Sequence, residues 1–420
     1  MAGCEELCIT HLCFQINGRN ILINSKTVPD FRFSLSELSG AFADLGVMLP
    51  LTLALISLNG MNATAVFVGV GIAYILTALV YRLPIPVQPL KSVSAVAISL
   101  GLAPVVIVTG AIWNAVAFLG MGAMDIDCWV KWAFPRGVVR GIQLGLSFLL
   151  FKSAWKLVST RLDWPRTLEV WKNVINWNVL LTIGALLILL VMLRFKKDWA
   201  TLGVFAFGIG LASWQSGIPH LTLQFTLPTL FPLIPSWNQL LQGLVLLALP
   251  QIPLSLGNSI YATADVARQY FGEHASTVTE KKLMLTMGVS DLVTAAIGGI
   301  PVCHGAGGLT AHYRLGARTG GAPLMMGFLF VSVGLVGGNS VTLITRLIPF
   351  AILGVLLAYV AAQHALLARD LRGAQEWITA LLVLVLTVWT GNLAIGFGSG
   401  SVFYHLWEFI GSARIRTSHL

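Results

Sequence analysis

Hydrophobic residues dominate this chain in long segments that are separated by short polar stretches or by proline and glycine. The segments 47–58, 179–193, 240–249 and 380–389 are almost uninterrupted by polar residues. A helix of about 20 apolar residues crosses the hydrocarbon core of a bilayer. A transmembrane β-barrel would instead show alternating segments of about ten residues. The pattern therefore predicts an all-α polytopic membrane protein.

We expect about seven apolar spans in each half of the chain, with shorter spans where a helix is broken. Because seven is odd, the second half enters the membrane from the opposite side, which predicts a 7+7 inverted repeat with about 14 spans. The first half holds the expected spans 36–58, 62–81, 88–102, 104–124, 136–158, 178–194 and 198–214. After a polar, proline-rich stretch at 215–237, the second half holds 238–261, 283–299, 304–315, 320–337, 340–367, 374–388 and 390–410.

Two short segments, 83–89 and 299–305, are similar to each other and lie at corresponding places in the two halves. Each carries proline within apolar sequence, and each directly precedes or opens the third span of its half. Pro50 and Pro250 likewise fall within the first span of each half. Paired interruptions of this kind are typical of a transporter substrate site built from broken helices. The pattern thus predicts discontinuous third and tenth spans.

Charged residues make up only 10% of the chain, against roughly 25% in soluble domains. The net charge is +9, and most Lys and Arg residues fall in loops on one predicted side. The other side holds only Arg161, Arg166 and Lys172, in a loop that also carries acidic residues. Since positive loops stay in the cytoplasm, both termini are expected there. The positive charge is then a topological signal, and no nucleic-acid partner is expected.

Gln88, Lys91 and Ser92 open the third span. A helix that begins inside the membrane presents unpaired N–H groups and a positive dipole end, which bind anions, and Lys91 would add a full charge. The alternative is that Gln88 and Ser92 only satisfy the backbone while Lys91 pairs with Asp44. Glu37 and Asp44 share one face of the first span, either as proton-coupling groups or as structural ion-pair partners.

The second half offers a similar device at Cys303, His304, Gly305, Ala306 and Gly307. The glycines permit close backbone approach, and the following residues can begin another helix within the membrane. His304 either contacts a ligand, with a charge that changes with pH, or serves as scaffold. Cys303 is expected to pack as a small apolar residue rather than to act as a nucleophile.

Gln251, Ser255 and Asn258 form one polar stripe at helical spacing in the eighth span. They would either contact a polar solute, as we expect for Gln251 and Ser255, or hold helices together. Asp291 and His312 belong to a charged cluster near the predicted cytoplasmic face, and we interpret them as part of a solvated rim.

The N-terminal tail carries Cys4, Cys8 and Cys13 with His11. A zinc site is one interpretation, but the spacing lacks the paired C-x₂-C pattern, which favours a disordered tail. The chain shows no Walker loop, H-E-x-x-H site or nucleophile elbow. We therefore expect no enzyme activity, no metal and no cofactor.

Four motifs resemble one family. PVQPLKS at 86–92 and PVCHGAGG at 301–308 are similar to the paired signature of the molybdate transporters that are related to sulfate permeases. ELSGAFADLG at 37–46 and PQIPL at 250–254 resemble the first- and eighth-helix motifs of the same family. Leu90 departs from the Met that is frequent at its position. The resemblance runs from about residue 33 to 389.

The resemblance implies the fold shared by sulfate and uracil permeases, in which a core moves against a gate and substrate lies between two helix N-termini. It divides this chain into a cytoplasmic tail (1–32), first core (33–135) and gate (136–214) parts, a loop (215–237), second core (238–338) and gate (339–411) parts, and a C-terminal tail (412–420).

The expected function is secondary active import of a tetrahedral oxyanion, foremost molybdate, with proton coupling left open. Sulfate and tungstate are competing substrates, and an anion channel is an alternative. A nucleobase or carboxylate permease of this fold is expected to carry a carboxylate in the eighth or tenth span, where it would bind ring N–H groups. The segments 249–259 and 301–313 contain no Asp or Glu. A membrane sensor or scaffold is disfavoured by the costly helix breaks. We expect a multi-pass protein of the plasma membrane, with a homodimer through the gate left open.

Overall fold

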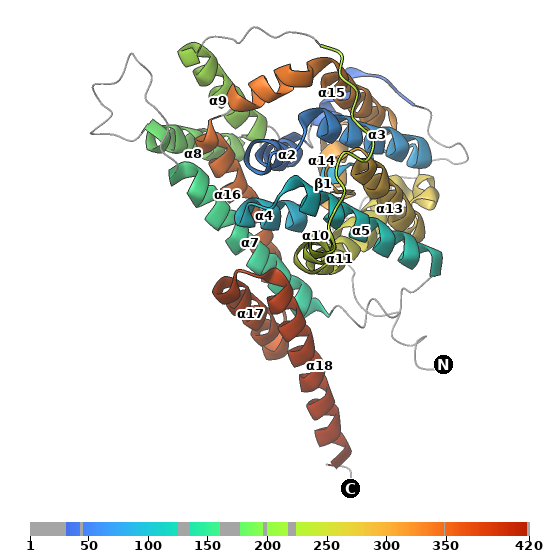
Figure 1. Ribbon diagram of the computed structural model, residues 1–420. Helices are drawn as coiled ribbons and strands as arrows, with labels where there is room; N and C mark the ends of the chain where they lie inside the picture. The colour runs from blue at the N-terminus through green and yellow to red at the C-terminus, as the bar shows by residue number, and fades with distance from the viewer. Residues whose placement is uncertain are drawn as a thin grey trace.

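The computed structural model is mainly helical (Figure 1). It describes residues 31–42, 45–124, 135–159, 177–195, 200–216, 224–347 and 349–417. Asp44, the N-terminal cysteines and His11 lie outside these residues, so the predictions made for them stay predictions.

The helices of the first half begin and end close to the predicted spans. Asn62 caps α3 because its side chain accepts a hydrogen bond from the N–H of Ala65 at 2.9 Å. Pro104 takes the first position of α5, where a missing N–H costs nothing. The elements are α1 (Leu35–Phe42), α2 (Leu45–Asn59), α3 (Ala63–Tyr81), β1 (Gln88–Pro89), α4 (Lys91–Leu100), α5 (Pro104–Met124), α7 (Arg136–Ser159), α8 (Trp177–Phe195) and α9 (Ala200–Ser216).

The second half opens with one long helical run that changes its winding. It comprises α10 (Trp237–Gln242), η4 (Gly243–Ala248), α11 (Leu249–Leu254), η5 (Ser255–Tyr261), α12 (Ala262–Phe271) and η6 (Gly272–Thr277). The turns η4 and η5 are wider π-helical turns on either side of Pro250 and Pro253. Proline removes a helical N–H and crowds the preceding turn, which accounts for the wider winding.

The remaining elements contain one correction to the predicted spans. The sequence suggested a new span from 340, but α15 continues to Leu347 and α16 begins only after Pro349. Two glycines at 337–338 lower helix propensity without stopping a helix, whereas a proline disfavours helix at the residue before it, although α11 accommodates Pro253. The elements are α13 (Glu280–Ala296), β2 (Val302–Cys303), α14 (Ala306–Arg314), α15 (Gly321–Leu347), α16 (Phe350–Leu366), η7 (Leu367–Asp370), α17 (Gly373–Thr390) and α18 (Leu393–Thr417).

The helices pack in two groups (Figure 1). In one group α3 packs on α15 and α5 on α13, while in the other α7 packs on α16 and α17. Small residues allow the close crossings: a Cβ on Gly71 would lie 2.7 Å from the carbonyl oxygen of Gly327. Similarly, a Cβ on Gly141 would lie 2.6 Å from the Cβ of Val383. Glycine at such crossings is typical of helix packing in membranes.

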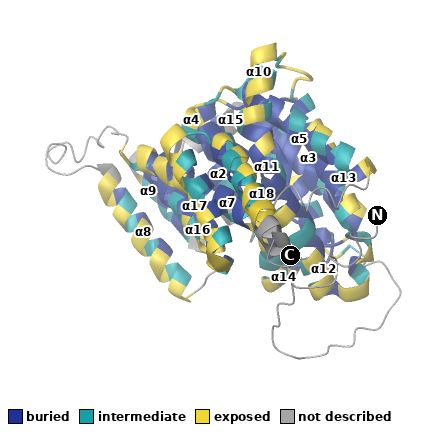
Figure 2. Cartoon of the chain, turned by 90° about the horizontal axis from the view of Figure 1, so that it is seen from below, coloured by how far each residue is buried: buried dark blue, intermediate teal, exposed yellow. Residues whose placement is uncertain are grey.

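Several helices are suited to a bilayer. Five described helical runs are long and apolar enough to cross a membrane. Apolar side chains are also exposed along α8, α17 and α18 (Figure 2), among them Leu187, Leu190 and Val385. Exposed apolar surface on this scale marks contact with lipid or with another protein. The runs are Ala63–Tyr81, Pro104–Met124, Trp237–Thr277, Phe350–Asp370 and Gly373–Thr390.

Candidate functional site

The two matched segments meet in a small antiparallel sheet. Gln88 of β1 pairs with Cys303 of β2, and Pro89 pairs with Val302. The N–H of Leu90 extends the pairing by donating to the carbonyl of Pro301 at 3.0 Å. Helix α4 begins directly after β1, and α14 begins shortly after β2. The two interrupted segments that resemble each other in sequence thus lie side by side.

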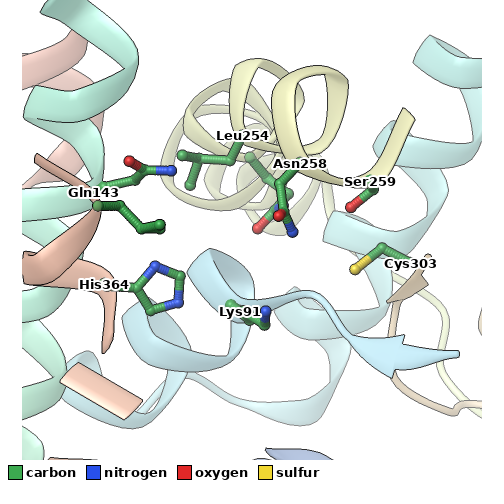
Figure 3. A pocket seen from close by; sticks show the side chains of 9 residues that line it. Lys91, Gln143, Leu254, Asn258, Ser259, Cys303 and His364 are labelled. Atoms are coloured by element: carbon green, nitrogen blue, oxygen red, sulfur yellow. The ribbon is translucent and has the colours of Figure 1, made fainter. Parts of the chain in front are cut away.

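A cavity of about 50 Å³ lies beside this sheet, between α4, the α11–η5 run, α7 and α16 (Figure 3). This volume holds a few water molecules. Most of its lining residues carry polar side chains, although much of the lining surface is apolar, and Lys91 is the only charged side chain among the described residues that form it. The lining residues are Lys91, Gln143, Gln251, Leu254, Asn258, Ser259, Cys303, His364 and Leu367.

Lys91 occupies the first position of α4 and is partly buried. None of the ion pairs between described residues includes it. A cation held at membrane depth is costly unless a counter-charge is available. The alternative pairing with Asp44 concerns a residue outside the described part of the chain.

Gln251 caps the N-terminus of α4 from the neighbouring helical run. Its Oε1 atom accepts hydrogen bonds from the N–H groups of Ser92 (3.0 Å) and Val93 (3.3 Å). Its Nε2 atom donates to the hydroxyl oxygen of Ser255 at 2.9 Å. The prediction placed the Ser92 N–H against a ligand, but the structure gives it to Gln251. Gln251 lines the cavity. Ser92 and Ser255 hydrogen-bond to the Gln251 side chain and are not part of the lining.

The N-terminus of α14 is arranged differently. Gly305 takes the cap position, and no side-chain hydrogen bond caps the helix. A Cβ on Gly305 would lie 3.1 Å from Oε1 of Gln88, so glycine permits this close approach. Gly307 is exposed, and a Cβ there would meet open space. The lining of the cavity does not include Gly305, Gly307, Ala306 or Gln88. Gly305 does lie close to Asn258, which is part of the lining.

His304 supports the two strands and lies outside the cavity lining. The residue is 1% exposed, and its Nδ1 donates to the carbonyl of Pro86 at 3.1 Å. Its Nε2 lies 3.0 Å from the hydroxyl of Thr286, which also contacts the hydroxyl of Tyr81 at 2.6 Å. Both ring nitrogens therefore hold protein groups, as the scaffold interpretation of His304 requires.

Asp291 and His312 correct the prediction of a solvated rim. Both side chains are fully buried. Oδ1 of Asp291 accepts the N–H of Val302 in β2 at 2.7 Å, and Nδ1 of His312 contacts the carbonyl of Pro84 at 2.9 Å. Their assignment to a charged cluster near the predicted cytoplasmic face suggested solvent, but each holds one of the extended segments instead.

Glu37 lies away from the cavity. Its carboxylate is buried and accepts the N–H groups of Arg318 (3.0 Å) and Thr319 (3.1 Å). It therefore ties α1 to the loop between α14 and α15. In this arrangement Glu37 has the contacts of a structural group.

Sequence reasoning did not single out Gln143 and His364, and it treated Asn258 only as part of a stripe. Gln143 and His364 come from α7 and α16, which lie far from the matched segments in sequence. Each is a polar residue within a predicted membrane span, and such a residue is a functional candidate at membrane depth. That signal was available, but it does not say which cavity the residue faces.

Comparisons with known proteins agree on the family. The family described as "Molybdate transporter of MFS superfamily" matches residues 36–150 and 243–364. Molybdate transporter 2 of Arabidopsis thaliana is 31% identical over 407 residues, covering 88% of this chain and 87% of that protein. Molybdate transporter 1 of the same plant is 29% identical over 423 residues, covering 90% of this chain and 89% of that protein.

Solved structures share the fold at low sequence identity. The transmembrane domain of the cyanobacterial bicarbonate transporter BicA matches with a TM-score of 0.66 at 17% identity, covering 86% of this chain and 96% of that one. The murine anion transporter Slc26a9, in its inward-facing state, matches with a TM-score of 0.66 at 14% identity, covering 92% and 70%. The chain therefore belongs to the molybdate transporter family, and it is a multi-pass membrane transporter rather than an enzyme.

Proposed function

We propose that the protein imports molybdate by alternating access, as a secondary active transporter. The observation that carries this proposal is the cavity beside the β1–β2 sheet, where Lys91 faces neutral hydrogen-bond donors and no described carboxylate lines the wall. Such a lining favours an anion over a cation. The names of the curated relatives supply molybdate as the substrate.

The charge balance of the site suits a dianion. Lys91 provides one positive charge, and the N-terminal ends of α4 and α14 add the positive ends of two helix dipoles. Importing a dianion into a negative interior costs about 2.3 kcal/mol per charge per 100 mV. Co-transported protons would offset this cost. Asp44 is the proton-carrying candidate in this proposal, because Glu37 and His304 are engaged in structural hydrogen bonds.

Alternating access requires two units that move against each other. In this proposal 33–135 and 238–338 form the core, and 136–214 and 339–411 form the gate, within an inverted repeat of about 14 spans. The separate packing of α3, α5, α13 and α15 from α7, α16 and α17 supports such a division. Both termini face the cytoplasm, the membrane is the plasma membrane, and a homodimer would form through the gate.

Calorimetry on the purified protein tests the substrate assignment. We expect tight binding of molybdate that sulfate displaces only weakly. Preferential binding of sulfate, which is also a tetrahedral dianion, would make the protein a sulfate transporter with the same site. If neither anion binds, the proposal is wrong. Single-channel currents in planar bilayers would instead support an anion channel.

A further inference from the structure

The cavity has a second wall that faces α4. This wall carries Gln143 of α7 and His364 of α16 (Figure 3). Gln143 is 4% exposed and His364 is 9% exposed, so both polar side chains are largely withdrawn from solvent. Buried polar groups without partners are costly. The groups that these two side chains bind therefore bear on the function of the cavity.

The amide of Gln143 has a fixed orientation. Nη1 of Arg140 donates to Oε1 of Gln143 at 2.9 Å. A guanidinium group has donors and no acceptor, so it can bind only the oxygen end of the amide. The nitrogen end must then point the other way, and in Figure 3 it points toward the cavity. Gln143 consequently presents a hydrogen-bond donor to whatever occupies the cavity.

Arg140 is itself held in place by η7, which follows α16. Its Nε donates to Oδ1 of Asp370 at 2.7 Å, and its Nη2 contacts Oδ2 of the same carboxylate. Arg136 adds a contact to Asp370 at 3.3 Å. Bidentate arginine–carboxylate pairs are geometrically specific. The pair joins α7 to η7 and keeps the donor of Gln143 aimed before any ligand arrives.

His364 faces Lys91 across the cavity (Figure 3). Its Nδ1 is buried and has no hydrogen-bond partner among the described residues. A neutral imidazole has one N–H donor and one acceptor nitrogen. In the tautomer that protonates Nδ1, this N–H and the ammonium of Lys91 are both donors and do not satisfy each other. An acceptor that carries negative charge, placed between them, would satisfy both.

We propose that Gln143 and His364 donate hydrogen bonds to the bound oxyanion, so that the anion bridges α4 to α7 and α16. The inference rests on the proposed function and extends it, since it assigns ligands on the second wall of the cavity. A tetrahedral oxyanion presents oxygens in four directions and can therefore accept donors from opposite walls at once. Binding then draws together the two groups of helices that alternating access must move.

The test is molybdate calorimetry on the purified full-length protein with Gln143→Met and His364→Leu. Hydrogen bonds to a charged group contribute about 1.5–3 kcal/mol, so each variant should weaken molybdate binding about 10- to 100-fold. The matched controls are Gln375→Met on α17 and His405→Leu on α18, which lie outside the cavity lining and should stay within about threefold of the wild type.

Two further measurements separate ligand binding from structure. The melting temperature of the ligand-free His364→Leu protein should not fall, because Nδ1 of His364 holds no described group. His364→Gln keeps a donor and should recover most of the affinity. Equal losses in His364→Leu and His364→Gln, or wild-type affinity in both His364→Leu and Gln143→Met, would overturn the inference. Failure of the wild type to bind molybdate or sulfate would instead overturn the proposed function.

Discussion

The starts of α4 and α14 are counterparts in the two halves, yet they are built in different ways. The α4 terminus carries Lys91, and Gln251 occupies its N–H groups at Ser92 and Val93. The α14 terminus carries no charged side chain and no side-chain cap, and glycine leaves its backbone accessible. The α4 terminus therefore presents a charged side chain to an anion, whereas the α14 terminus presents only backbone N–H groups.

This difference shows that matched sequence segments need not supply matched ligands. A helix N-terminus attracts an anion through free N–H groups and its dipole. At α4, Gln251 already accepts two of those N–H groups, so the attraction for an anion comes mainly from the helix dipole and from Lys91. On this basis Lys91 should dominate binding on the α4 side, while the α14 side should depend on an unobstructed backbone.

Replacing Lys91 with methionine should have the largest effect. A charge pair near a protein surface is worth about 4 kcal/mol at 4 Å, so Lys91→Met should weaken molybdate binding about 100- to 1,000-fold and abolish uptake. Calorimetry and uptake into cells measure this, with membrane expression checked by immunoblot. Lys152→Met, on an exposed lysine of α7, removes the same charge elsewhere. Unchanged uptake in Lys91→Met would remove Lys91 from the site.

Gln251→Glu should have the next largest effect. A carboxylate can still accept the N–H groups of Ser92 and Val93, so α4 stays capped, but a negative charge enters the cavity. We expect molybdate binding to fall about 100-fold through repulsion, with little change in melting temperature. Gln242→Glu on the exposed part of α10 is the control. Wild-type affinity in Gln251→Glu would mean that the anion binds away from this helix start.

Asp291→Ala should lower the stability of the protein by removing a contact to β2, rather than change the charge at the cavity. The N–H of Val302 would lose its acceptor, which costs about 1–3 kcal/mol of unfolding free energy when a buried group is left unpaired. Thermal melting in detergent measures the loss. Asp291→Asn keeps an acceptor oxygen and should lose less. Equal stability in Asp291→Ala and the wild type would contradict the role of Asp291 as a support of β2.

Gly307→Ala should have the smallest effect. The added Cβ meets open space, and alanine favours helix over glycine by about 1 kcal/mol, so stability should rise slightly. Molybdate binding should stay within about threefold. Gly305→Ala, whose Cβ would approach Gln88, should bind more weakly than Gly307→Ala. If calorimetry instead shows weaker molybdate binding in Gly307→Ala than in Gly305→Ala, the ligand lies over Gly307.

The sequence predicted the fold wherever local chemistry decides the structure. Closely spaced prolines at 84, 86 and 89, and Pro301 directly after two glycines and an isoleucine, disfavour helix, so the extended segments could be found before any contact was known. The end of α15 was misplaced because glycine weakens a helix without ending it, while the nearby Pro349 does end it. Helix bounds followed from such local rules.

The site was less accessible to sequence reasoning because it depends on packing between distant helices. Lys91 and Gln251 could be named from their motifs, but nothing local reveals that Gln251 would cap α4. Gln143 and His364 reach the cavity only through the packing of α7 on α16. Asp291 was misinterpreted because a carboxylate usually faces water, although this one falls in the middle of the predicted span 283–299, and its actual partner is a backbone N–H of a separate strand.

The shortness of the β1–β2 ladder constrains how the length of this chain can vary in evolution. Successive strand residues point to opposite faces, so one inserted or deleted residue between 299 and 305 would exchange those faces. The start of α14 would also rotate by about 100° relative to the cavity. The mostly exposed segment 224–236 is less restricted, because only a few of its backbone N–H groups, such as those of Gln224, Thr226 and Phe231, bond to neighbouring helices in the described structure. Related chains should therefore differ in length at 224–236 and keep a constant length across both strands.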